Sequence, residues 1–183
     1  MSNRQTVIRS LHDLGLAAWF GGSLFGAVGL NDASTAVREP ADRTTVAAAG
    51  WARWAPVNAA ALTAHTIGGI GLIAGNKKRV LAQADTRFNT IVKAGLTLTA
   101  IGVTAYSSIQ GGRLAAQTPA PAAGAVDPDS RTPQQVAAAQ KQLKILQWTI
   151  PALTGVLLVL SAQQGEQQKA SQVAKGLLRT ARK

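Results

Sequence analysis

The sequence predicts an all-α, polytopic membrane protein: a bundle of four transmembrane helices with a long fourth helix that projects from the bilayer. Four apolar runs occur along the 183 residues, each close to the roughly 20 residues that a helix needs to cross a hydrocarbon core. Charged residues gather between these runs rather than inside them. Apolar and polar residues do not alternate, which disfavours membrane strands, because such strands must close into a barrel.

The first predicted span covers residues 11–30, where Asp13 is the only charged residue. An apolar run after two arginines is also typical of a signal peptide. This run is long for a signal peptide, however, and no convincing small-x-small cleavage site follows it closely. The second predicted span covers residues 54–75, with Pro56 in the first turn, where a helix tolerates proline.

The third and fourth predicted spans cover residues 91–110 and 145–162. Residues 115–132, rich in Ala and Pro, predict an extracytoplasmic linker that is flexible or extended. Thr132 and Pro133 are a capping residue and a first-turn proline, and no helix breaker follows until Pro151. We therefore expect one helix over residues 133–162, about 45 Å long, whose first part projects from the bilayer.

The distribution of Lys and Arg predicts a multi-pass protein of the bacterial plasma membrane with both termini in the cytoplasm. Twelve basic residues fall before the first span, between the second and third spans or in the C-terminal tail, if Lys93 at the edge of the third span is included, and seven fall on the opposite side. An excess of Lys and Arg marks the cytoplasmic side. Four aromatic residues agree, because this orientation puts them near the outer interface: Trp51, Trp54, Tyr106 and Trp148.

Several classes of function are disfavoured by composition. The chain has no cysteine, which excludes disulfides and thiolate metal sites. The net charge of +11 comes mostly from residues that flank apolar runs, and no basic face interleaved with aromatic residues accompanies it, so we expect no nucleic-acid binding. No paired carboxylates in the spans, phosphate-binding loop or Ser-His-Asp set occurs, so we do not expect an enzyme.

The tail, residues 163–183, predicts a basic amphipathic helix in the cytoplasm. Apolar residues share one helical face, and basic residues occupy the other. Such a helix lies on the inner leaflet and binds anionic lipids. The predicted lipid-binding residues are Lys175, Arg179, Arg182 and Lys183. Gly176 weakens the helix, so a frayed, solvated tail is the alternative.

Two further patterns indicate helix packing. Small residues recur four apart, at Gly22 and Gly26 and again at Gly71 and Gly75, which favours close helix contact inside this bundle or with another subunit. A heptad seam on the long fourth helix begins at Val136 and includes Leu143, Leu146, Ile150, Leu153, Leu157 and Leu160. The part of this seam from Val136 to Leu146 docks either onto residues 31–53 or onto another chain.

His12 and His65 are the only candidate haem or transition-metal ligands. From the predicted span ends, the two histidines should lie roughly 8–10 Å apart along the bilayer normal, which disfavours a shared haem. We therefore expect no bound cofactor and no metal. His65 is interpreted as a structural, neutral residue bonded to Thr63, Thr66 or a neighbouring threonine, and His12 and Asp13 as interfacial polar groups.

The stretch LHDLGLAAWFGG, residues 11–22, resembles the first helix of copper-resistance D-like and HemJ-like membrane proteins, in which a histidine precedes Trp-x-Gly-Gly. This resemblance implies a metal or haem role for His12 alone. The whole chain also resembles uncharacterised actinobacterial four-span membrane proteins, a resemblance that implies no function.

Together these features favour a non-catalytic accessory or scaffold subunit of a larger membrane assembly. Its partners would be other membrane subunits or a second copy of the chain, meeting the heptad seam and the glycine ridges. The alternative is a haem-, quinone- or metal-handling membrane protein, which rests on His12 and His65. Transport by this chain alone is disfavoured, because four spans with one acid offer little for ion coupling.

Overall fold

The structure is a computed structural model that describes residues 3–167, apart from the side chains of 78, 79, 85 and 164–167. Within this part of the chain, every regular element is a helix. The elements in order are α1 (Asn3–Phe25), η1 (Gly26–Leu30), α2 (Asn31–Thr35), α3 (Pro40–Gly75), α4 (Lys77–Ala82), α5 (Ala84–Ala115) and α6 (Gln134–Gln167). Four helical segments are long and apolar enough to cross a membrane, which confirms the predicted fold class.

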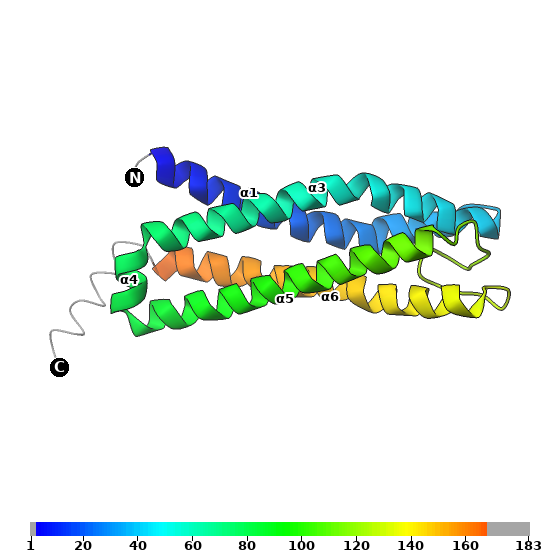
Figure 1. The fold of residues 1–183 in the computed structure, drawn as a ribbon. Helices are drawn as coiled ribbons and strands as arrows, with labels where there is room; N and C mark the ends of the chain where they lie inside the picture. Colours follow the sequence, from blue (N-terminus) through cyan, green and yellow to red (C-terminus); the bar gives the residue numbers. More distant parts are fainter. Residues whose placement is uncertain (1–2, 168–183) are drawn as a thin grey trace.

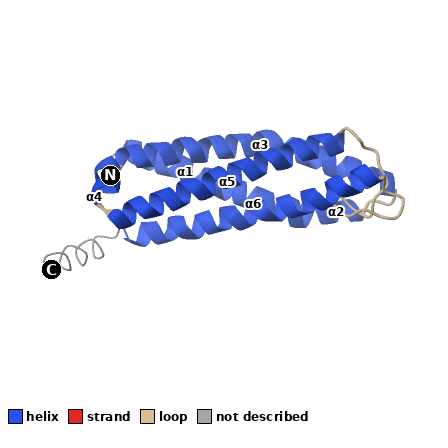
Figure 2. Ribbon diagram, turned by 60° about the horizontal axis from the view of Figure 1, so that its bottom comes forward, coloured by secondary structure: helices blue, strands red, loops and turns tan. Residues whose placement is uncertain are grey.

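The four long helices run up and down, and each packs beside the next one in sequence, with α6 closing the ring against α1. The N-terminus, α4 and the end of α6 lie at one end of the bundle, here called the α4 end (Figure 1). The opposite end carries α2, the start of α3 and residues 116–133, here called the linker end and the linker (Figure 2). The short connections from α1 through α2 to α3, and from α3 through α4 to α5, favour this antiparallel arrangement, whereas α5 and α6 are joined by the longer linker.

All four long helices extend beyond their predicted spans, and two of these extensions build the linker end. The first continues past residue 30 through η1 and α2 to Thr35, and α3 begins at Pro40 rather than at residue 54. Pro40 takes the first-turn position, where its fixed φ and missing N–H suit a helix start, and Asp42 adds a favourable negative charge there. Residues 31–53, which lie between the first two predicted spans, are therefore largely helical, and Ala47 of α3 shares an apolar cluster with Val136 and Leu143 of α6.

The η1 segment is a π-helical turn, in which an extra residue changes the direction of the side chains that follow. After it, Asn31 and Ser34 are buried. The Asn31 amide donates to the Gln147 side-chain oxygen at 2.7 Å, and the indole N–H of Trp51 donates to the Asn31 oxygen at 3.1 Å. This small polar network joins α2, α3 and α6 near the linker end.

Glycines set the packing of α1 against α3. A Cβ atom on Gly15 would lie 2.5 Å from the backbone nitrogen of His65, and one on Gly68 would lie 2.4 Å from that of His12. These distances are too short for any side chain, so the two backbones meet at this crossing. The crossing therefore fixes the register between the two helices.

Toward the linker end, the same helix pair packs indole rings onto glycines. The Trp54 ring covers Gly22, and the Trp51 ring covers Gly26. Toward the α4 end, Gly71 faces Ile8 and Gly75 faces the side chain of Gln5. The small-residue ridges of the sequence are thus used inside the chain.

The linker is extended and closely packed. Its residues Ala120, Ala125 and Val126 are buried in one apolar cluster with Ala47 of α3, Leu114 of α5, and Val136 and Leu143 of α6. The outer part of the heptad seam therefore docks within the chain, onto the first turns of α3 and onto the linker. This outcome is one of the two alternatives that the sequence left open.

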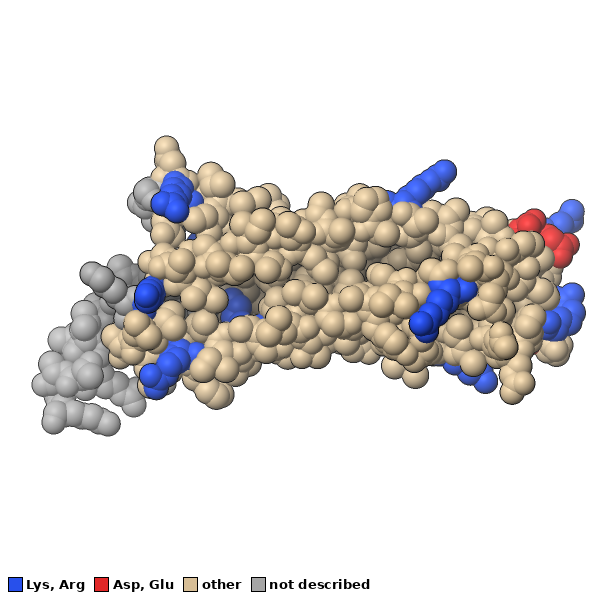
Figure 3. All heavy atoms as spheres, in the orientation of Figure 1, with Lys and Arg blue, Asp and Glu red and all other residues tan. Residues whose placement is uncertain are grey.

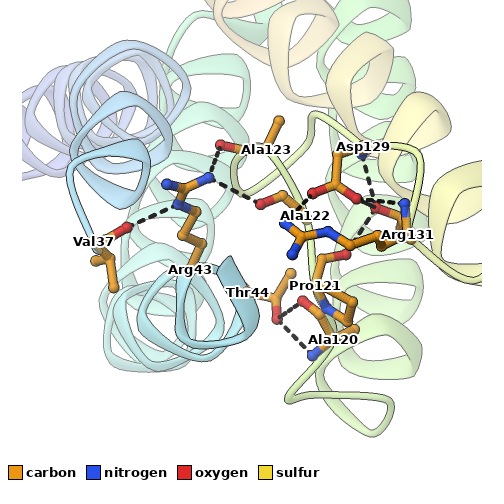
Figure 4. Close-up of polar contacts among 10 residues, drawn as sticks. Val37, Arg43, Thr44, Ala120, Pro121, Ala122, Ala123, Asp129 and Arg131 are labelled. Carbon is orange, nitrogen blue, oxygen red and sulfur yellow. Dashed lines mark hydrogen bonds and ion pairs between the residues drawn. The ribbon is translucent and has the colours of Figure 1, made fainter. Parts of the chain in front are cut away.

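Polar contacts hold the linker against α3 (Figure 4). The Arg43 guanidinium donates to the carbonyls of Val37, Ala122 and Ala123 at 2.8 to 3.2 Å. The Thr44 hydroxyl donates to the carbonyl of Ala120 at 3.0 Å and accepts from the Ala120 N–H at 3.1 Å.

A turn at Asp129 completes the linker. The Thr132 hydroxyl donates to the Pro121 carbonyl at 2.7 Å and accepts from the Asp129 N–H at 2.8 Å. The backbone N–H of Arg131 donates to the Asp129 carboxylate at 2.7 Å, and this bond lowers the pKa of that carboxyl. These bonds keep the linker extended rather than flexible.

The outer surface of the bundle suits lipid. On the face shown in Figure 3, Lys, Arg, Asp and Glu gather toward the two ends, and the middle lacks them. Large apolar side chains point outward from all four long helices, including Leu14, Ile67, Leu98 and Val156. In water such surface would be costly, whereas in a bilayer it meets hydrocarbon.

Candidate functional site

A cavity of about 680 Å³ lies among the helices in the half of the bundle nearest the α4 end. All four long helices and Val80 of α4 contribute to its wall. Figure 3 shows a hollow in this half of the molecule, with basic side-chain atoms recessed in it. Large apolar side chains form much of the wall: Leu16, Ile70, Ile73, Leu98, Ile101 and Leu158.

The polar groups of the cavity come from all four long helices, including Ser161 of α6, and from the turn after α3. Its charged and amide-bearing or imidazole-bearing lining residues are Arg9, His12, Asp13, His65, Asn76, Asn89 and Lys93. Asp13 is the only acidic residue among the lining residues, so charge of both signs faces the same space. An apolar wall with a few convergent polar groups is typical of a site for a small organic molecule.

The two histidines meet at this cavity. Their ring centroids are 4.3 Å apart, and the ring planes are inclined by 38°. The predicted separation of 8–10 Å along the bilayer normal is therefore wrong. The register of α1 and α3 follows the backbone crossing at Gly15 and Gly68 rather than the ends of the apolar runs, and this crossing puts His12 beside Gly68 and His65 beside Gly15.

His65 is 3% exposed and is bonded differently from the prediction. Its Nδ1 lies 3.1 Å from the backbone carbonyl oxygen of His12. The Thr63 hydroxyl, one of the predicted partners, donates instead to the carbonyl of Ala59 in its own helix. A carbonyl only accepts hydrogen bonds, so Nδ1 of His65 carries the proton and Nε2 of the neutral ring has a lone pair.

His12 is also buried within the bundle, at 6% exposed, and its predicted place near the cytoplasmic boundary of the membrane stays a prediction. Its Nδ1 lies 2.8 Å from a carboxylate oxygen of Asp13, whose side chain is 54% exposed. The carboxylate accepts the Nδ1–H, which leaves Nε2 of the neutral ring with a lone pair here as well. The pair thus has two Nδ1 atoms used as donors and two Nε2 atoms that accept.

Trp19, about two turns after His12 on α1, packs beside the pair. It is fully buried, and its ring centroid lies 6.1 Å from that of His65. The indole N–H donates to the Thr104 hydroxyl of α5 at 3.2 Å, which joins α1 to α5 across the bundle. A side chain held in this way limits the positions that the His65 ring can take.

The arrangement excludes a haem held by both histidines. Two axial imidazoles lie on opposite faces of a porphyrin, with ring centroids roughly 6 Å apart for metal–nitrogen bonds of about 2 Å. The two rings here lie side by side at 4.3 Å with no space for a porphyrin between them. Among the described residues, no group of three or more His, Cys, Asp or Glu is arranged to hold a metal ion.

One polar stripe of the site was visible in the sequence but was not used. Thr86, Asn89, Thr90, Lys93 and Thr97 all line the cavity from α5, and they recur three or four residues apart. This spacing puts them on one helical face. From the sequence, Lys93 is interpreted only as a basic residue at the edge of the loop between the second and third predicted spans.

The predicted interface residues have other roles in the structure. Gly22, Gly26, Gly71 and Gly75 contact other parts of this chain, as described above. Val136 and Leu143 are 2% and 3% exposed, and Leu146 is half-buried. These three positions of α6 therefore present no exposed apolar stripe to another subunit. The predicted lipid-binding residues Lys175, Arg179, Arg182 and Lys183 lie outside the described residues.

The chain matches no protein-family model, no curated protein and no solved structure. The resemblances noted from the sequence therefore stay predictions, and the cavity is the basis for proposing a function.

Proposed function

We propose that this protein binds a small lipid-soluble organic molecule in the cavity at the α4 end. The observation that carries the proposal is the combination of an apolar wall built by four membrane-spanning helices with a buried histidine pair beside it. The volume of about 680 Å³ lies in the range of sites for small organic ligands. Of the haem, quinone and metal alternatives, these features favour a molecule of the quinone class.

The composition of the site supports an organic ligand over a metal ion. Leu16, Ile101 and Leu158 contact the cavity and offer no atoms that coordinate a metal. The Asp13 carboxylate accepts the His12 Nδ1–H, so Asp13 acts as an orienting group for that ring. Two imidazoles alone would leave most of the coordination sphere of a metal to water.

The orientation proposed from the Lys and Arg distribution puts this cavity in the cytoplasmic half of a bacterial plasma membrane. Arg4, Arg9, Lys77 and Arg87 all belong to the α4 end. A molecule dissolved in the inner leaflet would then reach the cavity laterally, without crossing water.

The accessory-subunit function expected from the sequence stays a prediction. Its physical motive was an apolar stripe left exposed on a projecting helix. Val136 and Leu143 are buried within the chain, so this motive does not distinguish the accessory role from other roles.

The experiment compares two leucine substitutions in the full chain, purified in mild detergent. A Cβ at Gly69 would meet only the His12 ring carbon at 3.5 Å, so Gly69→Leu projects into the cavity without a backbone clash. Gly102→Leu is the matched control, because a Cβ there meets nothing within 4 Å.

Organic extracts of the two variants and of the unaltered protein are compared by mass spectrometry. We expect a lipid-soluble molecule to accompany the unaltered chain and the Gly102→Leu variant and to be reduced in the Gly69→Leu variant. An equal amount in all three, or the absence of any such molecule together with a Soret absorption band, contradicts the proposal.

A further inference from the structure

We propose that the head group of the ligand is a hydrogen-bond donor, a ring hydroxyl such as that of a hydroquinone, whose proton is accepted by the Nε2 atom of either His12 or His65. This inference rests on the proposed function and narrows the class of ligand.

Each of the two imidazole rings carries its proton on Nδ1. The Nδ1–H of His65 is committed to the His12 carbonyl, and the Nδ1–H of His12 is committed to the Asp13 carboxylate. Both of these hydrogen bonds use Nδ1, which leaves each Nε2 with a lone pair that can accept. The site thus offers two acceptors at the cavity wall.

Leaving the Nε2 acceptors without a hydrogen-bond donor costs free energy. His12 and His65 are more than nine-tenths buried, and both contribute to the wall of the cavity. An acceptor at the wall of an apolar cavity is poorly solvated, so a ligand that donates a hydrogen bond to it gains affinity. A ligand that carries only acceptors, such as an oxidised quinone, meets lone pairs at this wall and gains nothing there.

The shape of the cavity around the two histidine rings favours a ring-shaped head group with an apolar tail. The two rings lie side by side with centroids 4.3 Å apart, so both can contact one ring-shaped head group. Ile70, Leu98 and Ile101 continue the cavity with apolar surface, which suits an apolar ring substituent or tail. An aromatic hydroxyl is also a stronger donor than an aliphatic one.

Asp13 tunes the acceptor strength of His12. A carboxylate that accepts the Nδ1–H makes Nε2 of the same imidazole more basic, as it does for imidazoles that bind metals. Asp13 is therefore a positioning residue for His12 rather than a direct ligand contact. His65, oriented by a neutral carbonyl, is the weaker acceptor of the two.

The test measures the binding of three short-tailed probes by the unaltered full chain in lipid nanodiscs. The probes are a benzoquinol, its oxidised benzoquinone and its dimethyl ether, which keeps the ring but has no donor. We expect the quinol to bind roughly tenfold more tightly than the ether, a ratio that corresponds to one or two hydrogen bonds. Equal affinities for quinol and ether would overturn the inference.

Two variants locate the effect. His65→Phe keeps the ring and removes the acceptor, so it should reduce the preference for the quinol severalfold, whereas Gly102→Leu should leave it unchanged. The comparison of probes on the unaltered protein needs no variant and therefore stands even if His65→Phe does not fold.

The remaining outcomes separate the two proposals. If another lipid-soluble molecule occupies the cavity and is lost in Gly69→Leu, while no probe binds, the proposed function holds and the hydroxyl inference fails. If Zn²⁺ or Cu²⁺ binds tightly to the unaltered chain but not to His65→Phe, and the quinol is not preferred, the pair serves a metal and the inference is wrong.

Discussion

The backbone crossing of α1 and α3 gives the sharpest prediction about stability. In Gly15→Ala, the new Cβ would lie 2.5 Å from the His65 backbone nitrogen and 2.6 Å from the Ala61 carbonyl oxygen. Ordinary contacts begin at 3.4 Å, so the two helices must separate by about 1 Å. Both contacts are with backbone atoms, which cannot move away as a flexible side chain would.

Overpacking of this kind costs about 1–3 kcal/mol of the free energy of unfolding. The matched control is Gly102→Ala, where nothing lies within 4 Å and the better helix propensity of alanine favours the variant by up to about 1 kcal/mol. Unfolding in detergent micelles, followed by circular dichroism, measures both. If Gly15→Ala is as stable as Gly102→Ala, the close crossing, and with it the explanation for the histidine pair, is refuted.

Three further predictions concern topology, the tail and the linker end. The chain has no cysteine, so single cysteines introduced at the exposed positions Ser130 and Arg87 can be labelled in intact cells. Only the cysteine that replaces Ser130 should react with a membrane-impermeant reagent. Reaction only of the cysteine that replaces Arg87 would mean that the orientation is reversed. A peptide of the tail should leave anionic vesicles when its basic residues are replaced by Glu, since each contributes about 1 kcal/mol near such a surface; unchanged binding at moderate salt would count against this role. The residues to replace are Lys175, Arg179 and Arg182. Leu143→Asp should destabilise the isolated chain by about 3–5 kcal/mol, because it buries an unpaired charge in the linker-end cluster; a melting curve like that of the unaltered protein would show that the cluster does not form.

The sequence predicted the membrane-length helices well, because they depend on the transfer of apolar residues into lipid. Each apolar run became part of a membrane-length helix, because burial of about 20 uncharged residues is a strong and local signal. The start of α6 was also predictable, because Thr132 and Pro133 carry recognisable helix-start chemistry. Pro40 carries the same kind of signal for α3, but the charged residues around it suggested a loop.

The site itself depended on register, which is a tertiary property. The depths of His12 and His65 were inferred from the ends of the apolar runs, whereas the actual alignment follows the positions at which two backbones can touch. Gly15 and Gly68 mark those positions, and neither was among the glycines used as interface candidates. Pairing the glycines of the first two spans as an antiparallel contact would have brought the two histidines together.

The linker shows a second limit of prediction from sequence. An Ala- and Pro-rich composition predicts little local structure, and residues 116–133 indeed form no helix. Their order comes from partners distant in sequence, chiefly Arg43, Thr44 and the apolar face of α6. Composition alone does not reveal such partners, which is why the seam beginning at Val136 could not be assigned to one of its two possible docking surfaces.

The central claim, that two adjacent imidazoles present acceptors to a lipid-soluble ligand, is tested most directly by ¹⁵N NMR of the full chain in nanodiscs. The chain has two histidines, so a histidine-labelled sample gives only two imidazole sets, assignable with His65→Phe. Above the pH range in which histidine titrates, the account predicts that both rings carry the proton on Nδ1, and that the Nε2 signals shift when the benzoquinol is added. A ring protonated on Nε2, or Nε2 signals that do not respond to the quinol, would contradict it.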